Sequence, residues 1–183
     1  MARFVVSGSR TDRGSDPKPT TSKGSQLPAR TLIGLISDTH GLIRPEALEA
    51  LRGSDLIIHC GDVGDPVVLD ALRTLASVRA IRGNNDRGRW ASRLPAQDLV
   101  EVRGHAIRVL HNLAELDPDT DAAGLTAVVF GHSHKPLIEK RAGVLFINPG
   151  SAGPRRFKLP VTVATLALGS GGRCDAKIVR LGI

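Results

Sequence analysis

The sequence Thr31-Leu32-Ile33-Gly34-Leu35-Ile36-Ser37-Asp38-Thr39-His40 contains an apolar run that ends directly in polar side chains. Residues 31–36 predict a buried strand, and the polar residues that follow predict a loop. In open α/β sheets, ligands collect beyond the carboxyl ends of the strands. Asp38 and His40 are therefore candidate ligands, although an Asp-x-His sequence after a strand is also common in turns.

The same pattern recurs along the chain, where four more apolar runs each lead into a polar cluster. Leu56-Ile57-Ile58 leads to Asp62, Val78-Arg79-Ala80-Ile81 to Asn84, Ile107-Arg108-Val109-Leu110 to His111, and Ala127-Val128-Val129-Phe130 to His132 and His134. Each cluster alone has an ordinary explanation as a loop, a turn or a structural histidine. Because all of them follow successive strands, we interpret the seven side chains as one metal centre.

The donor types restrict which ions this centre could hold. The candidates offer carboxylate, amide and imidazole groups but no thiolate, which argues against a structural cysteine-rich zinc site. Mixed nitrogen and oxygen donors suit manganese, zinc, iron, nickel or cobalt, and we expect manganese. One carboxylate can face two cations at once, so the set could hold two divalent metal ions.

Helical patterns separate the first three strands. The segments 45–51 and 66–76 each begin with proline, and Val67, Leu69, Leu72 and Leu75 are expected to pack inward from the second. Strands alternating with helices predict a parallel sheet. Three antiparallel pairs are predicted in a largely antiparallel second half: 98–102 with 105–110, 137–140 with 144–147, and 160–168 with 177–181. We predict an α/β fold with two packed mixed β-sheets flanked by helices.

Composition predicts one folded domain behind a basic extension. Residues 1–30 are rich in Ser, Gly, Pro, Lys and Arg and contain six basic and two acidic residues, which gives +4 of the formal net charge of +7. We predict a disordered extension over residues 1–30 and one domain over residues 31–183, long enough to bury a single core.

Composition also bears on location and partners. The two cysteines cannot form a disulfide framework and no apolar segment is long enough to cross a membrane, so we expect a cytoplasmic protein. Aromatic residues make up 3% of the chain and tyrosine is absent. Surfaces that stack nucleic-acid bases are therefore scarce, and nucleic-acid binding is not expected.

The order of these motifs resembles that of the calcineurin-like metallophosphoesterase superfamily, which has Asp-x-His, Gly-Asp, Gly-Asn-x-Asp/Glu, His and Gly-His-x-His. The small bacterial and archaeal phosphodiesterase branch fits best, because it also has Asn-Pro-Gly-Ser, present here as Asn148-Pro149-Gly150-Ser151 and followed by Pro154-Arg155. The resemblance covers residues 31–182 and implies an α/β/β/α sandwich.

The resemblance also implies a role for each candidate residue. Asp38, His40, Asp62 and His134 would hold one ion, and Asp62, Asn84, His111 and His132 the other. A hydroxide between the two ions would attack the phosphorus of a small phosphodiester substrate. Asp86 would support catalysis by orienting a ligand or loop, and Arg155 would bind a phosphate oxygen of the substrate.

The chain departs from the superfamily pattern at one position. Much of the superfamily has histidine directly after the Gly-Asn pair, where this chain has Asn85. General-acid help from that position is absent, which favours substrates with acidic leaving alcohols. We expect a metal-dependent phosphodiesterase. The alternative is a non-catalytic protein-binding scaffold of the same fold, like the eukaryotic retromer subunit, and a homo-oligomer that pairs through a sheet edge is left open.

Overall fold

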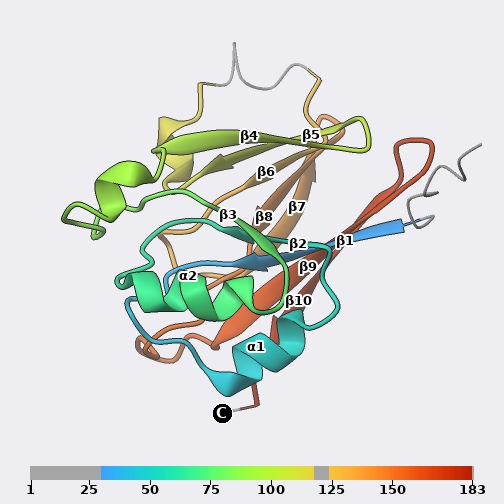
Figure 1. The fold of residues 1–183 in the computed structure, drawn as a ribbon. Coiled ribbons are helices and arrows are strands. Elements are labelled where there is room, and N and C mark those ends of the chain that lie inside the picture. The colour runs from blue at the N-terminus through green and yellow to red at the C-terminus, as the bar shows by residue number, and fades with distance from the viewer. Residues whose placement is uncertain (1–29, 118–123, 183) are drawn as a thin grey trace, which may run out of the picture.

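The computed structural model describes residues 30–117 and 124–182, which form two five-stranded β-sheets (Figure 1). The predicted N-terminal extension lies outside the described residues, except for Arg30. This residue begins the first strand and pairs with Gly169. The strand therefore starts one residue before the predicted domain boundary.

Sheet A has the strand order β10-β9-β1-β2-β3. Its strands are β1 (Arg30–Ile36), β2 (Leu56–His59), β3 (Ser77–Ala80), β9 (Thr162–Gly169) and β10 (Cys174–Arg180). β1, β2 and β3 are parallel, whereas β9 and β10 run antiparallel to their neighbours. This confirms the predicted parallel unit and the predicted final antiparallel pair.

Sheet B has the strand order β4-β5-β6-β8-β7. Its strands are β4 (Gln97–Val102), β5 (His105–Leu110), β6 (Ala127–Val129), β7 (Leu137–Arg141) and β8 (Val144–Asn148). The β4–β5 and β7–β8 hairpins are present as predicted. The three central strands, β5, β6 and β8, are parallel to one another, which the sequence analysis did not predict. Crossover connections bring the carboxyl ends of β5 and β6 to one edge.

The core lies between the two sheets. Its fully buried residues include Ile33, Leu35 and Ile58 from sheet A, and Ile107, Val129 and Ile147 from sheet B. Burying each such side chain contributes roughly 1.5–3 kcal/mol, which holds the sheets face to face. Cys60 belongs to this core, and burial raises the pKa of its thiol far above the ordinary range. Cys60 therefore serves as a small side chain of the core.

Both α-helices of the described residues pack on the outer face of sheet A, where Figure 1 shows α1 (Pro45–Leu51) and α2 (Pro66–Arg73). Each has proline in its first turn, and the Asp65 side chain caps α2 by accepting a hydrogen bond from the Val67 amide. Val67 is 54% exposed, which corrects its predicted inward position. Val68, Leu69 and Leu72 form the buried face instead.

The outer face of sheet B is covered differently. A short 3-10 helix, η2 (Leu113–Glu115), packs there beside Leu110, Val128 and Phe146. A second one, η1 (Ala91–Arg93), precedes β4. No helix in residues 30–117 and 124–182 is long and apolar enough to cross a lipid bilayer.

Candidate metal centre

All seven predicted ligands lie in loops that follow the carboxyl ends of strands. Asp38 and His40 follow β1, Asp62 follows β2, Asn84 follows β3, His111 follows β5, and His132 and His134 follow β6. Three of these strands belong to sheet A and two to sheet B. The predicted ligands therefore meet at the seam between the two sheets.

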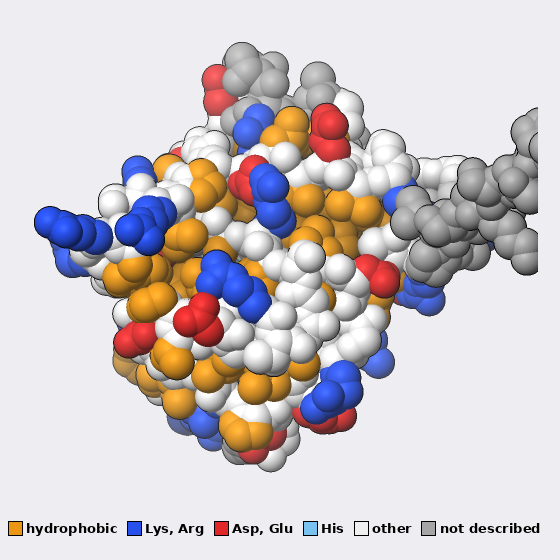
Figure 2. Space-filling view, viewed as in Figure 1, with side chains coloured by type: hydrophobic (Ala, Val, Ile, Leu, Met, Phe, Trp, Pro, Cys, Tyr) orange, Lys and Arg blue, Asp and Glu red, His pale blue; other side chains and the backbone are white. Residues whose placement is uncertain are grey.

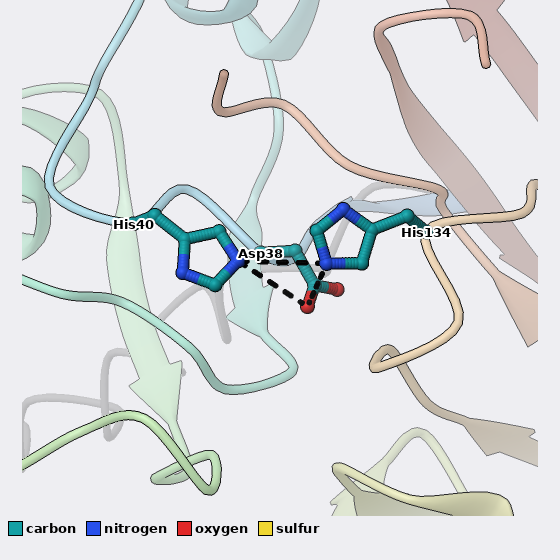
Figure 3. Close-up of side chains that lie close together, drawn as sticks. All are labelled: Asp38, His40 and His134. Carbon is teal, nitrogen blue, oxygen red and sulfur yellow. Dashed lines mark hydrogen bonds and ion pairs between the residues drawn. The ribbon is translucent and has the colours of Figure 1, made fainter. Parts of the chain in front are cut away.

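Asp38, His40 and His134 form the first cluster (Figure 3). Asp38 Oδ1 lies 3.2 Å from His134 Nε2, and the Nε2 atoms of the two histidines lie 3.5 Å apart. The two imidazole rings are stacked with their centroids 5.3 Å apart. Two nitrogens and one carboxylate oxygen thus converge on one point.

Asn84, His111 and His132 form the second cluster. Asn84 Oδ1 lies 3.1 Å from His111 Nε2 and 3.1 Å from His132 Nδ1. His111 is buried, whereas Asn84 and His132 are exposed. The second cluster therefore opens to solvent on one side.

Asp62 connects the two clusters. Its Oδ2 atom lies 3.8 Å from His40 Nε2 in the first and 3.5 Å from His111 Nε2 in the second. Its carboxylate is almost fully buried, at 2% exposure. This arrangement agrees with the bridging role that the family resemblance implies.

The spacing of these atoms fits metal coordination. Two ligands bound about 2.1 Å from one ion lie about 3.0 Å apart at a right angle and about 3.4 Å apart at a tetrahedral angle. Within the two clusters, four contacts between these nitrogens and oxygens span 3.1–3.5 Å, and the contact between His40 Nε2 and Asp38 Oδ1 is 4.0 Å. Asp38 Oδ1 and His134 Nδ1 are also buried without a hydrogen-bond partner. A cation would satisfy that carboxylate oxygen.

Hydrogen bonds behind His111 fix its tautomer. Its Nδ1–H donates to the Cys60 carbonyl at 2.8 Å, so Nε2 faces Asn84 and Asp62. Burial alone would lower the pKa of His111, but hydrogen bonds to Asp62 and the Cys60 carbonyl raise it. An outer hydrogen bond of this kind is typical of metal-binding histidines.

The carboxylate of Asp62 is held in its ionised form. Burial alone would raise its pKa, but hydrogen bonds from His111 and Asn85 hold the pKa well below its usual range. The Asn85 amide donates to Oδ1 at 2.8 Å, and its side-chain amide donates to Oδ2 at 2.5 Å. Asp62 is therefore charged at neutral pH before any cation binds.

The backbone is kinked at most of the predicted ligands. Among the described residues other than glycine, eight have positive φ, and five of them are Asp38, His40, Asp62, His132 and His134. Positive φ is uncommon for such residues and clusters at functional sites. Successive side chains after β1 and β6 are thereby turned toward one centre.

Two glycines permit the close packing of these loops. A Cβ atom at Gly131 would collide with the Ser37 hydroxyl and lie 2.7 Å from Asp38 Oδ2. A Cβ atom at Gly83 would collide with the Asp62 carboxylate. Only glycine lets these backbones approach the two aspartates so closely.

Asp86 joins two loops of the centre, and its supporting role in catalysis stays a prediction. Its Oδ1 accepts a hydrogen bond from the Gly64 amide at 2.7 Å, and its Oδ2 accepts from the amides of Gly83 at 2.8 Å and Val63 at 3.1 Å. The carboxylate is buried, and its three hydrogen bonds are all to backbone amides. It holds the Asp62 loop against the Asn84 loop.

The guanidinium at the centre belongs to Arg156, which the sequence analysis did not select. Its Nη2 atom lies 3.3 Å from His40 Nε2. The predicted Arg155 is its exposed neighbour, and its role as a phosphate ligand stays a prediction. Two consecutive arginines were the sequence signal, but the sequence does not indicate that Arg156 contacts His40.

His59 and His105 have structural contacts outside the metal centre. His59 is fully buried in β2 and bonds to the Thr39 hydroxyl at 2.9 Å. His105 is buried at the start of β5, where its Nε2–H donates to the Gly169 carbonyl at 3.2 Å. Neither ring belongs to the two clusters.

Comparison with known proteins defines the class of this metal centre. The sequence model of the family described as the calcineurin-like phosphoesterase superfamily domain matches residues 32–171. The chain therefore belongs to the calcineurin-like phosphoesterase superfamily.

Individual relatives agree with this family. A "probable metallophosphoesterase" of Methanothermobacter thermautotrophicus is 34% identical over 163 residues, which cover 82% of this chain and 93% of the relative. An archaeal phosphodiesterase of known structure has a TM-score of 0.67 at 24% identity, covering 81% of this chain and 100% of that chain. Vacuolar protein sorting 29 from Cryptosporidium parvum also has a TM-score of 0.67, at 18% identity. This match covers 84% of this chain and 98% of that chain. The similarity to these two structures concerns the fold.

Proposed function

We propose that this protein is a metal-dependent phosphodiesterase that uses two divalent ions, with manganese preferred. Asp38, His40, Asp62 and His134 would hold the first ion, and Asp62, Asn84, His111 and His132 the second. The observation that carries the proposal is the position of the Asp62 carboxylate, whose Oδ2 faces His40 at 3.8 Å and His111 at 3.5 Å. Only a residue placed between the clusters can serve both.

The bound ions would supply Lewis acidity toward the phosphoryl oxygens and lower the pKa of a water held between them. The chain's own groups would then position the substrate. Arg156 lies at the exposed edge of the first cluster, where its guanidinium can donate two hydrogen bonds to phosphate oxygens. Asn85 is engaged with Asp62 and offers no acidic proton to a leaving alcohol.

A diester rather than a monoester is supported by the space around the centre. A cavity of about 230 Å³ adjoins the second cluster and is lined by Arg82, Asn84, His111 and His132, among others. Arg156 contacts the first cluster and is not one of the residues that line this cavity. A phosphate between the clusters could therefore direct one ester substituent to each side.

Positive charge gathers on the loop between β3 and β4, whose Arg82 lines this cavity. Figure 2 shows Lys and Arg side chains gathered at the left edge of the molecule, where Figure 1 places the loop between β3 and β4. This loop contains four exposed arginines, Arg82, Arg87, Arg89 and Arg93. A basic rim of this kind attracts anionic substrates and raises their rate of association.

A non-catalytic scaffold is the second candidate, favoured by the shared fold with vacuolar protein sorting 29. Retention of all seven predicted ligands supports the enzyme instead. We propose a small phosphodiester as the substrate and a cytoplasmic location.

The test is metal analysis of the purified full chain together with hydrolysis of bis(p-nitrophenyl) phosphate and p-nitrophenyl phosphate across added metals. Close to two ions per chain and faster hydrolysis of the diester are expected, with manganese giving the highest rate. A chain that binds no more than one ion, or hydrolyses neither ester with any metal, would contradict the proposal.

A further inference from the structure

Phe157 is an unusual residue on the surface of this protein. Its side chain is 93% exposed, more than any other large hydrophobic residue in the described part of the chain, and its φ is 53°. Seven of the eight non-glycine residues with positive φ are predicted ligands or, like Arg103 and Ala142, precede glycine in a hairpin turn. Phe157 is the eighth, and it is neither.

The loop that carries Phe157 is anchored to the metal centre. The Ala152 amide donates to the Ser37 carbonyl at 3.1 Å, and Arg44 Nη2 donates to the Gly153 carbonyl at 3.3 Å. At the tip, the Leu159 amide donates to the Arg156 carbonyl at 3.1 Å and closes a tight turn. An anchored base and a closed tip fix the backbone that carries the exposed ring.

Arg156, the preceding residue, reaches the centre. Its Nη2 atom lies 3.3 Å from His40 Nε2, a predicted ligand atom. Consecutive Cα atoms are about 3.8 Å apart, so the Phe157 ring begins next to the residue that extends into the first cluster. A phosphate bound by Arg156 would leave its ester substituent close to this ring.

We propose that the substrate carries a planar aromatic ring, which stacks on Phe157 while Arg156 binds the phosphate. This inference rests on the proposed function and specifies its substrate class. Flat rings stack favourably on an exposed phenyl face, and a saturated substituent of equal size lacks this interaction. Three cationic residues, Arg155, Arg156 and Lys158, flank Phe157 in the sequence, and their charge matches the anionic phosphate to which the aromatic group is attached.

The binding test uses two matched pairs of ligands titrated calorimetrically into the manganese-loaded full chain. Benzylphosphonate is compared with cyclohexylmethylphosphonate, whose ring is saturated. In both compounds a methylene group replaces the ester oxygen. Adenosine 5′-monophosphate is compared with ribose 5-phosphate, which lacks the base. The first pair tests a ring attached at the ester position, and the second tests a nucleobase held at the distance of a sugar.

The variant Phe157→Leu keeps an apolar side chain but removes the aromatic face. We expect it to weaken binding of the ring-bearing ligand in one pair by about three- to tenfold, with little change for its partner. The pair that responds identifies the source of the ring. Arg156→Gln should instead weaken both members of each pair by a similar factor, because the phosphate is common to them.

Leu99→Ala is the matched control, since Leu99 is an exposed apolar residue on β4 and 42% exposed. It should leave all four affinities unchanged. The inference is overturned if Phe157→Leu retains the wild-type affinity ratio in both pairs, or if the wild type binds none of the four ligands. A ring preference in a chain that hydrolyses no diester would support this inference and contradict the proposed function.

Discussion

The carboxylate of Asp62 lies 3.5 Å from the imidazole of His111, although Asp62 follows a strand of sheet A and His111 follows a strand of sheet B. The contact crosses the seam between the sheets. It brings the ionised carboxylate of Asp62 next to Nε2 of His111, whose tautomer is fixed by the bond from Nδ1–H to the Cys60 carbonyl. A change at either residue should therefore affect both predicted metal sites.

Asp62→Asn should lower the metal content from about two ions toward one or none and lower turnover by several orders of magnitude, because the amide removes the shared charge. Metal analysis and kcat for bis(p-nitrophenyl) phosphate check this. Asp70→Asn is the matched control, since Asp70 lies on α2 in an exposed pair with Arg73. Near-normal turnover in Asp62→Asn would rule out a bridging role.

Asp86→Asn should weaken the junction between two loops of the centre. The side-chain NH2 group would face one or more backbone amides that now donate to the carboxylate. We expect a loss of about 1–3 kcal/mol in unfolding free energy and a roughly 10–100-fold loss in metal affinity or activity. Denaturant titration and metal titration measure these effects. Asp65→Asn should be close to neutral, since asparagine caps a helix as well as aspartate.

Stability should depend on pH through His59. The Thr39 hydroxyl donates its single hydrogen to the Val63 carbonyl, so it accepts from His59 Nε2, and the buried Nδ1 has no partner. Burial lowers the pKa of His59 to about 4. The unfolded chain binds this proton near pH 6.5 and the folded chain only near pH 4, so stability should fall as the pH drops through this window.

The loss attributable to His59 should be up to ~3 kcal/mol between about pH 6.5 and pH 4. Urea titrations at several pH values, compared between the wild type and His59→Gln, measure it. As the pH falls, the free energy of unfolding should decrease less in the variant than in the wild type, even if the variant is less stable at every pH. Parallel curves for the two proteins would show that His59 is not the responsible group.

Substrate preference should reflect the lack of an acidic proton at Asn85. For a series of diesters, log kcat/KM should fall steeply as the pKa of the leaving alcohol rises. Asn85→His should flatten this slope, because a protonated imidazole could assist poor leaving groups. Asn85→Ala serves as the comparison, since it removes the side-chain hydrogen bond to Asp62 without adding an acid. A slope near zero in the wild type would contradict this view.

Deletion of residues 1–29 should leave metal content and turnover unchanged, because β1 begins at Arg30. Deletion of residues 1–32 should lower the melting temperature, since Thr31 and Leu32 pair with Leu168 and Ala167 of β9. Thermal unfolding and the diester assay compare the two. Lost turnover in the shorter deletion would show that the extension contributes to activity.

The sequence was sufficient to predict most strands and the convergence of the seven predicted ligands. An apolar run that ends in polar residues, such as 31–40, predicts both a buried strand and the loop that follows it. The carboxyl ends of parallel strands then lie at one edge of the sheet. The parallel centre of sheet B was not predictable in this way. Hairpin signals identify β4 with β5 and β7 with β8, but they do not indicate how β6 inserts between them.

Side-chain direction was the least predictable property. In α2, Val67 and Val68 are equally apolar, and only the start of the helix decides that Val68 faces the sheet. Arg155 and Arg156 are chemically identical, and nothing in the sequence indicates that Arg156 contacts His40. Such choices depend on backbone dihedrals at one or two residues, which local composition does not specify.

The separation of His40 and His134 by 94 residues has a consequence for how the protein is made. During synthesis the ribosome releases β1 long before β6, so the nascent chain cannot assemble the first cluster until most of its length has emerged. Cations should therefore load only after the two sheets have docked. In a cell, the free metal ions present when the sheets dock would decide which metal each newly made molecule binds.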